Sequence, residues 1–239
     1  MAAGTSPATP VRLILASKSP ARAKLLTEAG IYHEILVSEV DEDAAVAAHG
    51  PADSAQTALL LARVKALAVA ARPEAQGALV LGCDSVFEFE GEAHGKPYTA
   101  EVAIERISRM SGKSGVLHTG HWLVDCRDSV QEPAQGKTVQ STIAQGKSVL
   151  EDTVPAGAGA LSSATVNFVT MLDSEIQAYV ATGEPLHCAG SFTIDGLGGA
   201  FIAGVEGDPH AVVGLSVSTL RELLTTTGVS LPELWRYTA

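Results

Sequence analysis

The sequence predicts an α/β fold built on a mixed β-sheet. Strand-like apolar segments alternate with helical patterns along most of the 239 residues, which is typical of α/β proteins. One pair of strands is separated only by Glu90-Gly91, a plausible hairpin turn that requires antiparallel pairing. Apolar residues make up 46% of the chain, so the protein can bury a large core. Strands alternating with helices, together with a hairpin, therefore predict a sheet with both parallel and antiparallel pairs.

Each element is predicted from its apolar pattern and its boundary residues. The first helix ends at Gly30, a typical residue just beyond a helix C-terminus. Thr99 and Asp173 are expected to cap the N-termini of two later helices. The predicted helices are 21–29, 54–71, 99–110, 173–181, 216–226 and 231–236. The predicted strands are 11–16, 32–37, 78–89, the strand after Gly91, 115–126 and 164–171, followed by a glycine-rich strand–turn–strand over 191–205.

The domain organisation is expected to be simple. Residues 1–10 have neither the basic nor the apolar region of a secretory signal and are expected to form a flexible tail. Residues 11–239 are expected to form a single domain. Residues 127–159 are rich in Gln, Gly, Ser and Thr and read as an inserted loop. The sequence leaves open whether this loop acts as a lid, contributes to a dimer or is a plain insertion.

Composition excludes several classes of function. The net charge is -11, which argues against binding a nucleic-acid polymer. No stretch approaches the roughly 20 apolar residues of a membrane-spanning helix. The three cysteines, Cys83, Cys126 and Cys188, have neither disulfide nor zinc spacing. These features predict a reduced, cytoplasmic protein without a membrane or nucleic-acid partner.

The segment LASKSPARAKLL joins the first predicted strand to the first helix and carries an unusual set of polar residues. Ser17, Ser19, Pro20 and Arg22 lie together at this corner. In one interpretation Ser19 is a helix N-cap and Pro20 the first helical residue. In the other, the free N–H groups of the helix start, the helix dipole and Arg22 bind a phosphate. The two interpretations are compatible.

Four charged positions are hard to explain as solvated surface. Asp84 interrupts an apolar strand, where a lone carboxylate is costly unless it is paired or binds a metal. Glu42 lies in an acidic loop over 38–43, Lys65 on a long helix, and Lys96 after the predicted hairpin. Taken singly, each could be an ordinary surface residue. Together they provide carboxylates for a Mg²⁺-type metal, cations for phosphates, and a base that can deprotonate water.

The same segments resemble, in order, the motifs of the Maf family of nucleoside triphosphate pyrophosphatases. LASKSPARAKLL is similar to the family's LASxSPRRxxLL opening. EVDED, LARVKA, GCDSV, GKP and SGKSGVLHTG resemble the motifs that follow. GEPLHCAGSFTIDGLGGAFI and DPHAVVGLSV resemble the C-terminal signature. The resemblance covers residues 12–224 and leaves out mainly the loop at 127–159.

The resemblance implies a fold, a reaction and partners. The implied fold is an elongated, two-lobed α/β molecule with a mixed, twisted sheet, related to the inosine triphosphatase type. The implied reaction converts a nucleoside triphosphate into a monophosphate and pyrophosphate with a divalent cation, Mg²⁺ or Mn²⁺. A cytoplasmic location and a homodimer are also implied.

The resemblance also implies catalytic roles. Asp84 would be the general base that activates water against the α-phosphorus, and Glu42 and Asp84 would bind the metal. Arg22, Lys65 and Lys96 would neutralise charge on the triphosphate as pyrophosphate leaves.

Substrate-binding roles fall to Ser17, Ser19, Ser85 and Asp195. Ser17 and Ser19 would hold phosphate at the helix start. The family's paired arginines appear here as Ala21 and Arg22, so one cation is missing. Ser85 and Asp195 occupy positions that help to select the base in relatives, and Asp195 could accept a hydrogen bond from a base N–H. Because of Ala21, a nucleotide-binding regulatory protein with weak catalysis is the alternative function. A phosphohydrolase that releases orthophosphate is a third.

Overall fold

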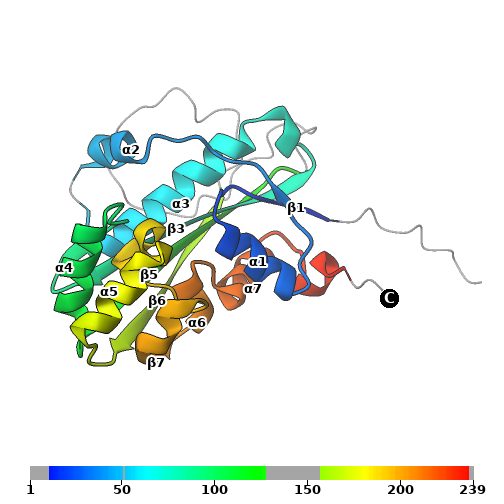
Figure 1. Cartoon of the computed structure of the whole chain (residues 1–239). Helices are drawn as coiled ribbons and strands as arrows, with labels where there is room; N and C mark the ends of the chain where they lie inside the picture. The colour runs from blue at the N-terminus through cyan, green and yellow to red at the C-terminus, as the bar shows by residue number, and fades with distance from the viewer. Residues whose placement is uncertain (1–10, 51, 128–156, 237–239) are drawn as a thin grey trace, which may run out of the picture.

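The computed structural model describes residues 11–50, 52–127 and 157–236 (Figure 1). The predicted tail at 1–10 and most of the predicted loop at 127–159 lie outside these residues. The strands are β1 (Arg12–Leu15), β2 (Glu34–Ile35), β3 (Ala78–Phe89), β4 (Glu92–His94), β5 (Ser114–Asp125), β6 (Ala158–Phe168) and β7 (Ile202–Gly207). The α-helices are α1 (Pro20–Glu28), α2 (Glu42–His49), α3 (Ser54–Ala70), α4 (Ala100–Met110), α5 (Asp173–Ala181), α6 (Pro209–Val213) and α7 (Val217–Thr225). Short 3₁₀ helices are η1 (Pro73–Ala75), η2 (Glu184–His187), η3 (Ala189–Ser191), η4 (Leu197–Phe201) and η5 (Leu231–Leu234).

The described strands form one mixed, seven-stranded sheet in the order β2-β1-β3-β5-β6-β7, with β4 paired to β3. β1 is parallel to both β2 and β3, whereas β3, β5, β6 and β7 pair antiparallel. The hairpin at Glu90-Gly91 joins β3 to β4 as predicted. The predicted α/β class with a mixed sheet is confirmed.

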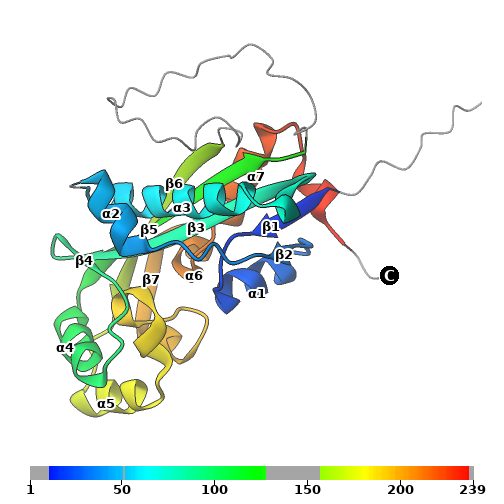
Figure 2. The same cartoon turned by 90° about the horizontal axis from the view of Figure 1, so that it is seen from above.

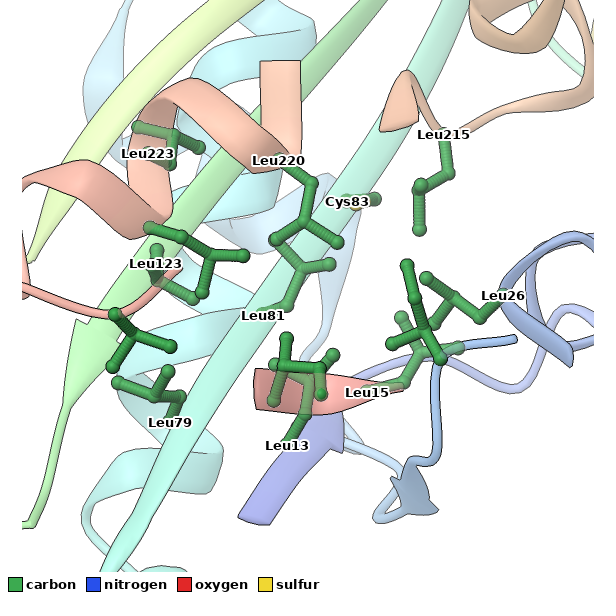
Figure 3. Packing of buried hydrophobic residues seen from close by; sticks show 14 of the residues in the cluster. Leu13, Leu15, Leu26, Leu79, Leu81, Cys83, Leu123, Leu215, Leu220 and Leu223 are labelled. Atoms are coloured by element: carbon green, nitrogen blue, oxygen red, sulfur yellow. The ribbon is translucent and has the colours of Figure 1, made fainter. Parts of the chain in front are cut away.

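Two hydrophobic cores lie one after the other along one face of β3. Every second side chain of a strand points to the same face, so the odd-numbered residues of β3 contribute to both cores. Leu79, Leu81 and Cys83 pack with α1, α7 and η5 in the first core (Figure 3). Phe87 and Phe89, farther along the same face, pack with α4 and α5 in the second. Figure 2 shows α4 and α5 together at one end of the sheet, away from α1. The two lobes therefore share the long central strands, and their cores meet near residue 85.

The opposite face of the sheet is covered by α3, which approaches the strands unusually closely. A Cβ atom at Gly82 would lie 2.2 Å from the carbonyl oxygen of Ala62, and one at Gly120 would lie 2.3 Å from that of Ala58. Because both positions lack a side chain, the helix backbone rests directly on β3 and β5. This contact brings Lys65 of α3 to the level of Asp84.

We expect Gly82→Ala to lower the free energy of unfolding by about 1–3 kcal/mol, because the added methyl group overlaps backbone atoms of α3. Urea denaturation followed by circular dichroism measures this loss. Gly204→Ala on β7 is the matched control, since a Cβ there meets nothing within 4 Å. Equal losses in the two variants would contradict the close-packing explanation.

Several sequence-based predictions of secondary structure were wrong. The strand predicted at 32–37 is only Glu34–Ile35, and the last predicted helix is a 3₁₀ helix over Leu231–Leu234. β6 begins at Ala158, so residues 158–159 belong to the sheet and not to the predicted loop, and the strand predicted at 164–171 starts earlier. The N-cap of α5 is Leu172 and not Asp173. Residues 191–205 contain no strand–turn–strand: η3 and η4 precede β7, because the turn folds around the side chain of Glu184.

None of the described helices combines the length and apolar character needed to cross a membrane.

Candidate active site

The candidate site lies at a gap in the sheet edge. β1 pairs with Ala78–Leu81 of β3, and β4 pairs with Phe87–Phe89. Between these pairings, residues 82–86 have no strand partner on that edge within the described chain. The segment after β1, with Ser17, and the segment after β4, with Lys96, leave their strands at the two ends of the gap. A ligand placed in the gap could therefore reach side chains on both faces of β3.

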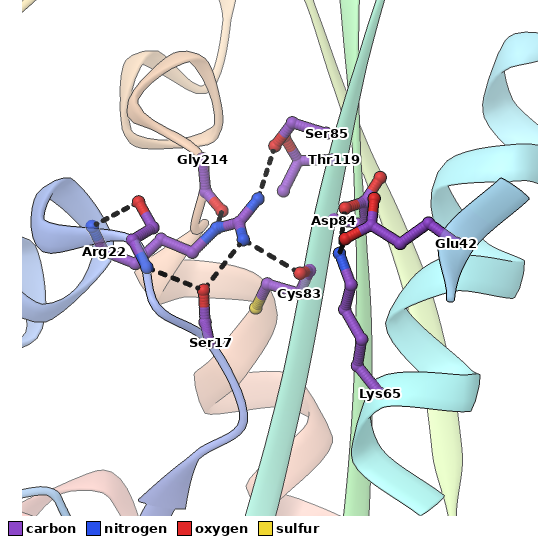
Figure 4. A network of polar contacts seen from close by, with 10 residues as sticks. Ser17, Arg22, Glu42, Lys65, Cys83, Asp84, Ser85, Thr119 and Gly214 are labelled. Carbon is purple, nitrogen blue, oxygen red and sulfur yellow. Dashed lines mark hydrogen bonds and ion pairs between the residues drawn. The ribbon is translucent and has the colours of Figure 1, made fainter. Parts of the chain in front are cut away.

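Two groups of polar residues flank β3 at this gap. Asp84 points to the α3 side, and the neighbouring Ser85 points to the side of the two cores, as alternation along a strand requires. Figure 4 shows Lys65 and Glu42 with Asp84 on one side, and Arg22 with Ser85 on the other. Six of the sequence-predicted residues are thus brought together as two clusters that share one strand: Lys65, Glu42 and Asp84 in one, and Arg22, Ser17 and Ser85 in the other.

The first cluster is a buried lysine between two carboxylates. Lys65 Nζ lies 2.6 Å from Asp84 Oδ1 and 2.8 Å from Glu42 Oε1. Lys65 and Asp84 are each 8% exposed, whereas the side chain of Glu42 is half-exposed. Burial raises the pKa of Asp84, although the cations Lys65 and Arg22 act in the opposite direction. The buried carboxylate is therefore a better proton acceptor than an exposed one.

The acidic segment 38–43 is only partly a loop, which corrects the sequence-based expectation. Glu42 is the first residue of α2, and the side chain of Asp41 caps this helix by accepting a hydrogen bond from Ala44 N at 2.9 Å. Glu42 and Asp43 lie in the first turn, where the helix dipole favours negative charge. The helix start, and not a flexible loop, directs Glu42 towards Lys65.

The second cluster is organised by Arg22, which is 9% exposed. Its Nε donates to the carbonyl of Gly214 at 2.6 Å, and Nη1 donates to the carbonyl of Cys83 at 2.9 Å. Nη1 also donates to Ser17 Oγ and Nη2 to Ser85 Oγ, both at 3.1 Å. Protein groups thus occupy four of the five guanidinium N–H bonds. Arg22 supplies positive charge to the site but has one N–H left for a ligand.

The two hydroxyls that Arg22 contacts, those of Ser17 and Ser85, differ in what they can offer a ligand: one can donate a hydrogen bond and the other can only accept. Ser17 Oγ accepts from Arg22 and from Ser19 N, so its own proton is available to a ligand acceptor such as a phosphate oxygen. Thr119 donates its only hydroxyl proton to the carbonyl of Ala211 at 2.8 Å. Ser85 must therefore be the donor in its 2.9 Å contact with Thr119. Ser85 has no proton left and can only accept, which suits a sugar hydroxyl or a base N–H.

The carbonyl that holds Arg22 lies on a well-anchored loop. Gly214 has a φ of 114°, in the left-handed region that favours glycine. Two residues later, Ser216 N donates to His121 Nε2 at 2.8 Å, and Ser216 Oγ donates to Asp208. Burial lowers the pKa of His121 to about 4, so the ring stays neutral and able to accept at neutral pH. Arg22 is therefore held by a preorganised backbone.

The remaining predicted residues lie outside both clusters. Ser19 is the N-cap of α1, as the capping interpretation expected, and its N–H contacts Ser17. Lys96 is exposed, and no other described residue forms a hydrogen bond or ion pair with it. Asp195 lies near α1, where its Oδ2 is 3.9 Å from Lys24 Nζ.

Thr119, Gly214 and Glu184 have structural roles that no pattern in the sequence indicated. Gly214 follows a helix of five residues, α6, whose start the dipeptide Asp208-Pro209 could have signalled. Thr119 and Glu184 lie within segments that carry the family resemblance, but neither motif reveals the hydrogen-bond partner of the side chain.

Comparisons with known proteins identify the family of the chain. The family model described as "Maf-like protein" matches residues 12–227. A protein of Leifsonia xyli subsp. xyli named nucleoside triphosphate pyrophosphatase is 46% identical in an alignment of 231 residues that covers 94% of this chain and 97% of the relative. Relatives with the same name from Streptomyces coelicolor and Salinispora tropica are 46% and 47% identical, covering 94% and 95% of this chain and 94% and 88% of their own lengths. The chain therefore belongs to the Maf-like protein family.

Proposed function

We propose that this protein is a hydrolase that cleaves nucleoside triphosphates into nucleoside monophosphate and pyrophosphate. The observation that carries the proposal is the buried Asp84–Lys65 pair with Glu42, located at a gap in the sheet edge beside the N-terminus of α1. The names of the relatives support the substrate class.

Each cluster has a part in this reaction. Asp84 takes the proton from the water that attacks the α-phosphorus, and Lys65 orients this carboxylate and offsets negative charge. Ser17 and the N-terminus of α1 bind phosphate oxygens, while Arg22 contributes charge behind them. Lys96, with its exposed ammonium group, binds the leaving pyrophosphate. Ser85, which can only accept, faces the nucleoside.

The carboxylates also fit a divalent cation. Asp84 and Glu42 both contact the same lysine nitrogen, so they lie close enough to share a small ion, and each has a second oxygen without a partner in the described structure. No cluster of three or more His, Cys, Asp or Glu residues suited to a metal exists among the described residues. This set fits Mg²⁺ or Mn²⁺, which take further ligands from phosphates and water. When bound, the cation would stabilise negative charge on the phosphates.

We expect chelation with EDTA to abolish pyrophosphate release, and added Mg²⁺ or Mn²⁺ to restore it. Glu42→Gln should raise the metal concentration needed for half-maximal activity about tenfold or more, because one of two carboxylates is lost. A metal titration of the melting temperature gives a second readout, since a bound ion stabilises the folded state. Full activity in excess EDTA would contradict the metal assignment.

The test of the function is a product assay. The protein is incubated with a panel of canonical and modified nucleoside triphosphates, and pyrophosphate and orthophosphate are measured separately. Pyrophosphate with monophosphate supports the proposal, whereas orthophosphate would indicate a different phosphohydrolase. Tight nucleotide binding without product would favour the regulatory alternative, which is suggested by Ala21 and by the nearly saturated Arg22. The homodimer and the cytoplasmic location stay predictions.

A further inference from the structure

The side chain of Glu184, which the proposed mechanism does not use, is the centre of a hydrogen-bond network. Its Oε1 accepts from Tyr179 OH at 3.0 Å, from Gly198 N at 3.0 Å and from the hydroxyl of Thr193. Its Oε2 accepts from Leu197 N at 3.0 Å. The 193–198 turn is therefore attached to one carboxylate by contacts at both of its ends.

The glycines of this turn allow the network to form. A Cβ at Gly196 would lie 2.7 Å from Glu184 Oε2, and one at Gly198 would lie 2.4 Å from the hydroxyl oxygen of Tyr179. The backbone must pass this close for its N–H groups to reach the carboxylate. Gly196 and Gly198 are thus explained by the close approach of the backbone to Glu184 and Tyr179.

The turn carries Asp195 towards α1, on the other lobe. Asp195 lies 3.9 Å from Lys24 Nζ, and the two side chains are 36% and 57% exposed. An exposed ion pair of this length contributes at most about 1 kcal/mol, so it cannot fix the turn by itself. The position of Asp195 is therefore set by the hydrogen bonds to Glu184.

We propose that Glu184 is a positioning residue that determines nucleotide selectivity by fixing Asp195 beside Lys24 of α1. The inference rests on the proposed function, in which Ser85 faces the nucleoside, and on the sequence-based expectation that Asp195 accepts a hydrogen bond from the base. A carboxylate held in one position strengthens the binding of only those bases that place an N–H group opposite it. A mobile carboxylate can move to accept a hydrogen bond from several different bases, so it discriminates less between them. The proposed mechanism gives Glu184 no contact with the phosphates or with the attacking water, so its effect is on discrimination between bases.

Glu184→Gln is a sharp test because it changes one atom and cannot keep all four contacts. Burial raises the pKa of Glu184, but the hydrogen bonds from Thr193, Gly198, Leu197 and Tyr179 outweigh this and hold the pKa below its ordinary value. The side chain is therefore ionised at neutral pH. In the glutamine variant, an NH₂ group replaces one of the two oxygens. In the position of Oε2 it faces the N–H of Leu197, and in the position of Oε1 it faces the donors Tyr179, Thr193 and Gly198, so donor meets donor in either case. Either orientation releases part of the turn.

The experiment is a double-mutant cycle of Glu184→Gln and Asp195→Asn, read as kcat/KM for each nucleoside triphosphate. We expect Glu184→Gln to change the ratio between the two best substrates about tenfold, mainly through KM, because Asp84 is untouched. In the Asp195→Asn background the same change should alter the ratio less than about twofold. The cycle is repeated with dissociation constants of α,β-methylene analogues, which resist cleavage at the α-phosphorus.

Controls separate positioning from general damage. Glu175→Gln removes a carboxylate that accepts from Leu172 N at 2.8 Å in the same lobe, away from the turn, and should leave the ratio unchanged. If Glu184→Gln does not fold, Tyr179→Phe is the substitute: it removes the hydroxyl that donates to Glu184 Oε1 and accepts from Thr193 N, and it should shift the ratio in a smaller, Asp195-dependent way.

Two results would overturn the inference: an unchanged ratio in Glu184→Gln, or equal effects with and without Asp195. The two proposals can fail separately. If the variants change the ratios of analogue dissociation constants as expected but the wild-type protein releases no pyrophosphate, the positioning role stands and the proposed function fails.

Discussion

Asp84→Asn should reduce pyrophosphate release about 10²-fold or more while the protein remains folded. The amide has nearly the shape of the carboxylate and can still accept a hydrogen bond from Lys65, but it cannot take a proton from water. Steady-state assays with each metal measure the loss.

Stability provides an independent check on the same variant. Because burial raises the pKa of Asp84 in the folded state, its ionisation is less favourable there than in the unfolded chain. The stability linked to this group is therefore present at low pH and is lost as pH rises through the folded pKa. The neutral asparagine should remove this dependence, which melting temperatures measured over a series of pH values would show.

The matched control is Asp173→Asn, an exposed residue at the start of α5, which should retain full activity. Near-normal turnover of Asp84→Asn would show that another group accepts the proton.

Arg22→Met should cost about 3 kcal/mol or more in the free energy of unfolding, whatever the substrate proves to be. The variant keeps an apolar chain of similar length but leaves the carbonyls of Gly214 and Cys83 buried without their donor. Ser17 and Ser85 lose a partner as well. Chemical denaturation measures the loss.

Arg221→Met, on the exposed face of α7, should change stability by no more than about 0.5 kcal/mol. If the two arginine variants unfold at the same denaturant concentration, Arg22 is not the structural link between α1, β3 and the Gly214 loop.

Much of the fold was predictable because the apolar patterns are strong. The predicted strand over 78–89 coincides with β3, and the helix predicted at 54–71 matches α3 to within one residue. The prediction failed where side-chain hydrogen bonds to the backbone, and not the pattern of apolar residues, determine the local structure. The glycine-rich stretch after Ser191 looks extended, but it forms short helices and a turn because Glu184 binds its backbone N–H groups.

The candidate site was predictable as a set of residue types but not as an arrangement. The structure brings Lys65 into ion pairs with Asp84 and Glu42, while their joint role in catalysis stays a prediction. The sequence could not reveal that Arg22 is engaged by two backbone carbonyls, because carbonyl positions depend on tertiary structure. The direction of the Ser85 hydroxyl proton depends likewise on Thr119 and on a carbonyl far along the chain.

The gap between β1 and β4 also bears on aggregation. An uncovered strand edge can pair with a strand of another molecule, and natural proteins keep such edges short or blocked. Here the edge spans only residues 82–86, is closed at both ends by strands, and has the Cys83 carbonyl covered by Arg22. The arrangement that opens β3 to a small ligand thus excludes a foreign strand. Substitution of Arg22 would remove this cover, and we expect such variants to self-associate during refolding.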